Sequence, residues 1–270
     1  MAKIQSIYRY PIKGLTPEPL SRIALAPGQT IPGDRLYAIE NGPSGFNPEA
    51  PAYLSKTHFL MLMKNERLAS LRTSFDQETH TLTIETPTLP APASKEGAGR
   101  SNSEKPVRGK ISADLRTAEG RSAIESFFAE FCADELRGPP KILHGGGHSF
   151  SDVARKVVSI INLASVAAVK DMVGTPVHPL RFRGNLYVQG WAAFSELDLV
   201  GRDLTAGTVR LNAVKRIVRC AATNVDPDTG LRDLEVPRTL MRNLGHADCG
   251  IYAEVAESGE IAAGDTIEIV

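Results

Sequence analysis

Apolar and polar residues alternate along many short stretches of this chain, and Gly, Pro, Asn or Asp bounds most of them. A period of two is typical of strands with one buried face. Residues 157–161 are aliphatic almost throughout, which indicates a strand buried on both faces. The segments predicted as strands are residues 4–10, 20–25, 141–143, 157–161, 186–188, 208–211 and 214–219, with hairpins over 72–85 and over 250–270.

Helical periodicity is rarer. Ile124, Phe127, Phe128 and Phe131 recur at helical spacing and predict a helix over residues 122–136 with one apolar face. Two further helices are predicted over 163–173 and 236–244. Residues 57–71 are expected to form a short helical turn followed by a strand.

Asn162 and Gly174 bracket the second of these helices. Asn is a preferred N-cap, and Gly accepts the left-handed backbone that ends many helices. The free N–H groups at such a helix start also suit an anionic ligand.

Many short strands and few helices predict a mainly β protein with some α (α+β), built as β-barrels rather than as a doubly wound sheet. Residues 86–106 are rich in Pro, Ala, Ser and Gly and have no hydrophobic period, so we expect a mobile excursion there. The chain has no internal repeat.

Composition narrows the function classes. The 270 residues carry 31 basic and 31 acidic side chains, so no overall field attracts nucleic acid or a membrane surface. No apolar run is long enough to span a bilayer, and the first residues lack a signal-peptide core. Three widely spaced cysteines make no disulfide framework, which favours a reducing, cytoplasmic location.

Cys220 is the most informative candidate for chemistry. It follows the predicted strand 214–219, lies close in sequence to Arg216 and Arg219, and precedes the turn-forming residues 226–230. Neighbouring cations favour a thiolate, which is a nucleophile and a soft metal ligand. The alternative is a small buried hydrophobe, and spacing alone favours that interpretation.

Other polar motifs are ambiguous by themselves. Lys13 before Gly14 fits a solvated turn, and Arg35 fits an ion pair with Asp34. His144-Gly-Gly-Gly-His148 resembles a metal or phosphate loop, but it lacks a second ligand pair and the Lys-Ser/Thr of a P-loop, so a flexible loop is the stronger interpretation.

Taken together and in order, these elements resemble the MOSC family, especially the branch that contains the mitochondrial amidoxime-reducing component and its bacterial relatives. The resemblance covers nearly the whole chain. It rests on Tyr10-Pro-Ile-Lys13, Gly33-Asp-Arg35, residues 159–165, Phe182-Arg-Gly-Asn185, and Arg219-Cys220 followed by residues 225–230.

The resemblance implies an N-terminal β-barrel-like domain over residues 1–115 and a MOSC β-barrel domain with peripheral helices over 116–270. It also implies that Cys220 ligates molybdenum in the molybdenum cofactor. Lys13 would hold the cofactor's phosphate, and Gly14, where many relatives have serine, would offer only its backbone N–H. The further cofactor contacts that it implies are Arg35, Asn162, Arg183 and Asn185.

The implied activity is reduction of N-hydroxylated compounds by oxygen-atom transfer to molybdenum. Asp226 and Asp228 are candidates for the substrate mouth, although turn formation explains them equally well. A separate electron-donor protein is expected, because the chain has neither an iron–sulfur cysteine quartet nor a dinucleotide motif. No pyridoxal phosphate is expected.

Three alternatives remain open. The first is a non-catalytic carrier of the molybdenum cofactor or of sulfur. The second is a Cys-dependent hydrolase that uses Cys220 with His144, His148 or His246. The third is an interaction module with a buried cysteine.

Overall fold

A computed structural model describes residues 1–86 and 109–270. Of the excursion expected over 86–106, residues 87–106 lie outside this description.

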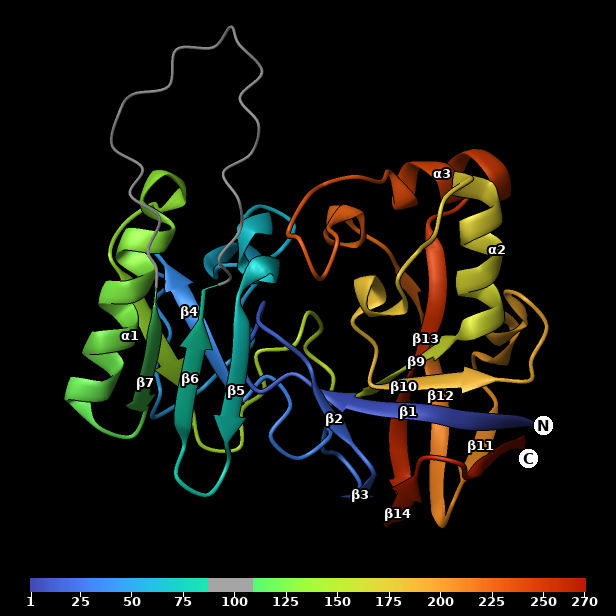
Figure 1. The fold of residues 1–270 in the computed structure, drawn as a ribbon. Helices are drawn as coiled ribbons and strands as arrows, with labels where there is room; N and C mark the ends of the chain where they lie inside the picture. Colours follow the sequence, from blue (N-terminus) through green and yellow to red (C-terminus); the bar gives the residue numbers. More distant parts are fainter. Residues whose placement is uncertain (87–108) are drawn as a thin grey trace, which may run out of the picture.

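Seven strands form a closed barrel (Figure 1). The barrel closes because the first strand of the chain, at one end of the strand order, pairs with the strand at the other end. In order around the barrel they are β10 (Leu186–Gln189), β9 (Val158–Asn162), β13 (Asp248–Glu257), β12 (Val209–Val218), β11 (Asp203–Ala206), β15 (Thr266–Ile269) and β1 (Ala2–Arg9). The β9–β10 pair is parallel and the other pairs are antiparallel. The core is aliphatic, with Ile4, Leu204, Leu211 and Ile251 fully buried.

Short strands extend the barrel. β2 (Glu18–Leu20) pairs with β1, and β3 (Arg22–Leu25) pairs with β14 (Gly259–Ala262). Both chain termini lie at the same end of the barrel, consistent with the pairing of β1 with β15 (Figure 1). The first residues of the chain therefore belong to the same barrel as the last.

Beside the barrel lies a second unit, which we call the N-terminal lobe (Figure 1, left). It consists of a two-stranded sheet, a three-stranded sheet and one long helix packed on a common core that includes Phe127, Phe128 and Phe131. Its elements are β4 (Tyr37–Asn41), β8 (Pro140–His144), β5 (Arg72–Asp76), β6 (Thr81–Glu85), β7 (Lys110–Asp114) and α1 (Ala118–Phe131). The domain boundary near residue 115 stays a prediction.

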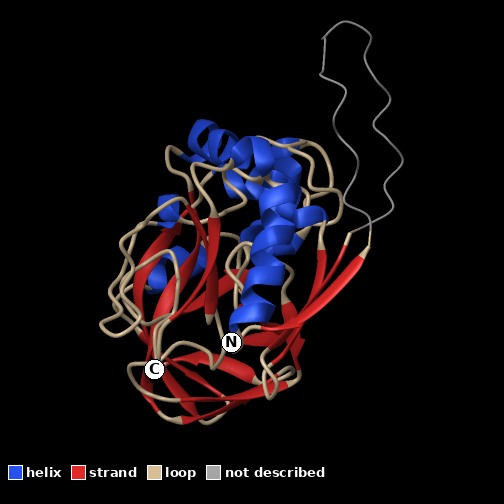
Figure 2. Ribbon diagram, turned by 90° about the vertical axis from the view of Figure 1, so that its left-hand side faces the viewer, coloured by secondary structure: helices blue, strands red, loops and turns tan. Residues whose placement is uncertain are grey.

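Within residues 1–86 and 109–270, the α-helices occur where the periodicity indicates. α1 begins four residues before its predicted start, because the Thr117 side chain accepts a hydrogen bond from the Gly120 N–H and caps it. α2 (Leu163–Val173) is confirmed with Asn162 as N-cap and Gly174 at φ +80° as C-cap. α3 (Val236–Leu244) is also confirmed and packs near α2. Figure 2, which views the molecule from the side of the N-terminal lobe, shows a long helix lying along the strands. The predicted fold class, mainly β with some α, is confirmed.

Three local predictions are wrong. Residues 57–71 form two 3₁₀ turns, η1 (Lys56–His58) and η2 (Glu66–Ser70), rather than a turn and a strand. The strands expected over 208–211 and 214–219 are one strand, β12. β13 and β15 are not a hairpin, because β13 pairs with β12 and β9 while β15 pairs with β11 and β1. The remaining 3₁₀ turns are η3 (Ala133–Glu135), η4 (Pro179–Phe182), η5 (Ser195–Leu199) and η6 (Ala221–Asn224).

Among the helices of residues 1–86 and 109–270, none combines the length and apolar character needed to cross a membrane.

Glu196 ties α2 to the barrel. Its side chain is fully buried, and its carboxylate accepts hydrogen bonds from the Asn162 amide at 3.0 Å, the Ser165 hydroxyl at 2.8 Å and the Gly250 N–H at 3.1 Å. A buried carboxylate is tolerated only with such a set of donors. This network fixes the junction of β9, α2, η5 and β13.

We expect Glu196→Ala to lower the free energy of unfolding by about 3–5 kcal/mol, because three buried donors lose their acceptor. Glu196→Gln, which keeps the shape and one carbonyl acceptor, should cost less. Urea denaturation measures both. The control is Glu235→Gln, which breaks an exposed ion pair with Arg238. If Glu196→Ala were as stable as this control, the structural role of the Glu196 network would be contradicted.

Candidate functional site

A cleft of about 240 Å³ lies between the N-terminal lobe and the barrel. Residues from both units line it, and several of them are basic. The basic side chains that line it are Lys13, Arg35, Lys56, Arg181, Arg183, Lys215, Arg216 and Arg219. Such a wall suits an anionic ligand.

Cys220 lies in this cleft just beyond the end of β12, where it precedes the 3₁₀ turn η6. Its side chain is partly exposed, whereas Cys132 and Cys249 are buried. The Lys56 Nζ lies 3.4 Å from the Cys220 Sγ. The sequence did not indicate Lys56, because 164 residues separate the two and no motif surrounds the lysine.

The two arginines near Cys220 in sequence point elsewhere. Arg219 donates to the backbone oxygens of Cys249 and Phe182. Arg216 donates to the Leu197 oxygen at 2.9 Å and pairs with Asp198. The cation beside the thiol is therefore Lys56, from the other side of the cleft.

Lys13 is nearly fully buried at the base of the cleft. Its ammonium donates to the Phe150 oxygen at 2.8 Å and pairs with Asp152 at 2.5 Å. Burial lowers the pKa of this ammonium, and Asp152 offsets part of the loss. Gly14 beside it has φ +85°, and a Cβ there would lie 3.3 Å from the Leu60 oxygen, so glycine suits the position.

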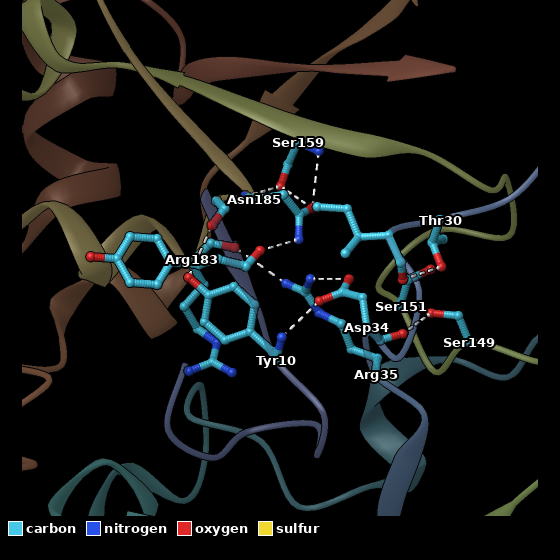
Figure 3. Close-up of polar contacts among 12 residues, drawn as sticks. Tyr10, Thr30, Asp34, Arg35, Ser149, Ser151, Ser159, Arg183 and Asn185 are labelled. Carbon is cyan, nitrogen blue, oxygen red and sulfur yellow. Dashed lines mark hydrogen bonds and ion pairs between the residues drawn. The ribbon is translucent and has the colours of Figure 1, made fainter. Parts of the chain in front are cut away.

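Arg35 and Arg183 are held against one tyrosine. Their guanidinium carbons lie 4.4 and 4.3 Å from the centroid of the buried Tyr10 ring, and Figure 3 shows the ring between them. Arg35 also pairs with Asp34 and donates to the Arg183 oxygen at 3.2 Å. Both arginines have left-handed backbones, at φ +50° and +48°, which is uncommon for residues other than glycine.

Arg183 differs from Arg35 in its bonding. Among residues 1–86 and 109–270, its guanidinium has no ion pair or hydrogen bond. Burial lowers the pKa of Arg183, and the neighbouring charge of Arg35 acts in the same direction. An arginine remains charged under such conditions, so Arg183 is a cation available to a ligand.

Asn185 lines the cleft, but most of its amide is already engaged. The oxygen accepts from the Ser159 N–H and hydroxyl, and the amide nitrogen donates to the Tyr8 oxygen (Figure 3). An asparagine amide has two donor hydrogens and two acceptor positions, so one N–H remains for a ligand. Its main role here is to join β1, β9 and β10.

The expectation that Asn162 contacts the cofactor is not supported by its position in the structure. Asn162 is fully buried, caps α2 and donates to Glu196 and to the Ala192 oxygen, so its side chain has no access to the cleft. The sequence predicted correctly that Asn162 caps α2. It did not indicate that the buried Glu196 carboxylate accepts a hydrogen bond from the Asn162 amide.

The two aspartates of the turn also lie outside the cleft lining. Asp226 accepts from the Asp228 and Thr229 N–H groups and pairs with Arg181 at 2.9 Å. Asp228 pairs with Arg72 and is largely exposed. Both therefore shape the turn, which is the alternative that the sequence left open.

The histidine loop lies outside the cleft lining as well. The His144 ring lies 4.8 Å from that of Tyr37, and the His148 ring lies 4.8 Å from that of Phe150. Among residues 1–86 and 109–270, no three His, Cys, Asp or Glu side chains are placed to share a metal ion.

Two family models match the chain. The model described as the MOSC N-terminal beta barrel domain matches residues 1–135, and the model described as the MOSC domain matches residues 141–268. Mitochondrial amidoxime reducing component 2 of Bos taurus is 30% identical over 122 residues, 41% of this chain and 36% of that protein. The Homo sapiens protein of the same name is 32% identical over 98 residues, 32% of this chain and 29% of that protein. The chain spans about a third of the length of the curated relatives it matches.

Two solved structures are also similar. The YuaD protein of Bacillus subtilis is 14% identical with a TM-score of 0.44, over 99% of this chain and 94% of that one. YiiM of Geobacillus stearothermophilus is 20% identical with a TM-score of 0.34, over 42% of this chain and 53% of that one.

Thiol labelling tests the exposure assigned to Cys220. Burial raises the pKa of Cys132 and Cys249 to about 12, so both should resist a thiol reagent at pH 8. We expect one reactive thiol per native chain, three after unfolding, and none in native Cys220→Ala. Two or three fast thiols in the native wild type would contradict the structure.

Proposed function

This chain belongs to the family that joins a MOSC N-terminal beta barrel domain to a MOSC domain, and from that premise we propose that its cleft binds a molybdenum cofactor through Cys220. The observation that carries the proposal is the meeting of Cys220, Lys13, Arg35 and Arg183 in one cleft, although they are far apart in the sequence.

The side chains fit such a group. The partly exposed sulfur of Cys220 is a suitable donor for a soft metal centre. Arg183 is a partly buried cation whose guanidinium has no ion pair or hydrogen bond among the described residues. Lys13 and the remaining Asn185 N–H supply further donors for phosphate and pterin edges. Arginine provides a planar fork of donors that suits both.

The reaction that we propose is reduction of an N-hydroxylated compound to its amine, amidine or imine. The N–O bond breaks, two electrons and two protons are taken up, and the oxygen leaves as water. When bound, the cofactor supplies two-electron oxygen-atom transfer. The chain's own residues bind and orient. Arg35, Arg183 and Lys13 would hold the anionic parts of the cofactor, while Lys56 places a positive charge beside the Cys220 sulfur.

The electrons require a second protein. The chain has three cysteines, one fewer than the quartet that usually holds an iron–sulfur cluster, and within residues 1–86 and 109–270 they are not grouped around a common point. We therefore infer a separate reductase or electron carrier as partner.

A non-catalytic carrier of the same cofactor is the second candidate, because the cleft would serve binding equally well without turnover. A Cys-dependent hydrolase finds less support: within the described residues, no histidine lines the cleft that holds Cys220. The partial exposure of Cys220 also argues against an inert core cysteine.

Metal content tests the proposal. The protein should be purified from a host that makes the cofactor, and molybdenum and pterin should be measured per chain. We expect both in the wild type, molybdenum strongly reduced in Cys220→Ala, and no change in Cys132→Ala, a matched cysteine outside the cleft. A wild type without molybdenum and pterin would contradict the proposal.

Turnover separates the enzyme from the carrier. With an artificial electron donor, the loaded wild type should reduce a hydroxylamine or an amidoxime. Arg183→Gln should reduce activity per molybdenum by about tenfold or more through looser placement of the cofactor. Loaded protein that turns over no N-hydroxylated compound would favour the carrier.

A further inference from the structure

One carboxylate neutralises two lysines of the cleft. The Lys13 Nζ pairs with Oδ1 of Asp152 at 2.5 Å, and the Lys56 Nζ lies 3.3 Å from its Oδ2. The lysines come from the segment after β1 and from η1, whereas Asp152 comes from the connection between β8 and β9. The carboxylate therefore bridges two cations from different parts of the chain.

This arrangement resembles the one that a phosphate would make, because two oxygens of a single acid group each receive one ammonium group. Two ammonium groups this close repel each other unless an anion lies between them. Desolvation opposes the ionisation of Asp152, but the charges of Lys13 and Lys56 outweigh it and hold the pKa of the carboxyl well below its usual range. At neutral pH the bridging group is an anion.

Asp152 belongs to a partly exposed connection that precedes β9. Residues 151–157 contain no helix or strand, and the Asp152 side chain is 44% exposed. The segment is held at the surface by the Arg155–Glu254 pair, by a hydrogen bond of 2.8 Å from Lys156 to the Gly147 oxygen, and by one of 3.2 Å from the Tyr53 hydroxyl to the backbone oxygen of Asp152. Its other anchor in the cleft is the Asp152 side chain itself.

We propose that Asp152 is a resident counter-ion of the cleft, which the phosphate group of an incoming ligand must displace from Lys13 and Lys56. A phosphate dianion carries more charge than the carboxylate and pairs with both lysines. Both anions at one place would repel each other strongly. Asp152 thereby sets the anion affinity of the cleft, and its departure releases the segment 151–157.

The inference rests on the proposed function in one respect, since Lys13 is the residue assigned there to the cofactor's phosphate. Its test needs no molybdenum. Phosphate binding is measured on a chain purified without cofactor, so its result does not depend on the molybdenum and pterin analysis. Failure of the Asp152 proposal can therefore be told apart from failure of the proposed function.

Calorimetric titration of the whole, cofactor-free chain with inorganic phosphate tests the exchange. Asp152→Asn should bind phosphate about tenfold tighter than the wild type or better, because the competing charge is gone. Glu254→Gln is the matched control, since it removes one negative charge and the ion pair of Arg155 in the same segment without touching the lysines; it should stay within about twofold of the wild type. Adding Lys13→Gln to Asp152→Asn should abolish the gain.

Equal or weaker phosphate binding by Asp152→Asn would overturn the proposal and make Asp152 a residue that positions the lysines. So would the absence of phosphate binding by both proteins. Limited trypsin digestion of the wild type decides the question without a variant: cleavage after Arg155 or Lys156 should be faster with phosphate bound, and unchanged or slower cleavage would overturn the proposal.

Discussion

Cations gathered in one partly buried cleft repel one another, and the surrounding fold is arranged to hold them there. Carboxylates compensate three of these cations, and an aromatic ring compensates a fourth. Arg35 has the Asp34 carboxylate, Lys13 and Lys56 share Asp152, and Arg183 has the face of Tyr10. Aromatic faces attract cations, so one ring can hold two guanidinium groups that would otherwise separate. The left-handed backbones of Arg35 and Arg183 cost about 1 kcal/mol each, which the packing of the Tyr10 region must offset.

Closure of the barrel brings these groups together. β1 ends just before Tyr10 and Lys13, β10 follows Arg183, and β12 ends two residues before Cys220. Antiparallel pairing places the end of β1 beside the start of β10. Cys220 joins them across the face of the sheet, where Ser159 of β9, Tyr252 of β13 and Lys215 of β12 lie side by side and line the cleft. The N-terminal side of the cleft contributes Lys56, which places a charge beside the Cys220 sulfur.

Local sequence predicted most elements, because short periodic segments and caps act over a few residues. Asn162 and Gly174 bracket α2 as expected, and the phenylalanine stripe forms the buried face of α1. Pairing between distant strands was not predictable: β13 and β15 look like neighbours in sequence and pair with other strands. At the site, motif resemblance indicated Lys13, Arg35, Arg183 and Cys220, which the cleft brings together. Lys56 and Asp152 carry no local signal, since their roles arise only from contacts across the cleft. Asn162 was assigned to the cofactor through the family resemblance of residues 159–165, but the buried Glu196 already uses its side chain.

The central claim is that the Cys220 sulfur faces this basic cleft as a metal ligand. X-ray absorption at the molybdenum edge tests it most directly, with the wild type compared with Cys220→Ala loaded to a measurable level with the same cofactor. We predict one sulfur neighbour more around molybdenum in the wild type than in the variant. The same number of sulfur neighbours in both proteins would contradict the claim.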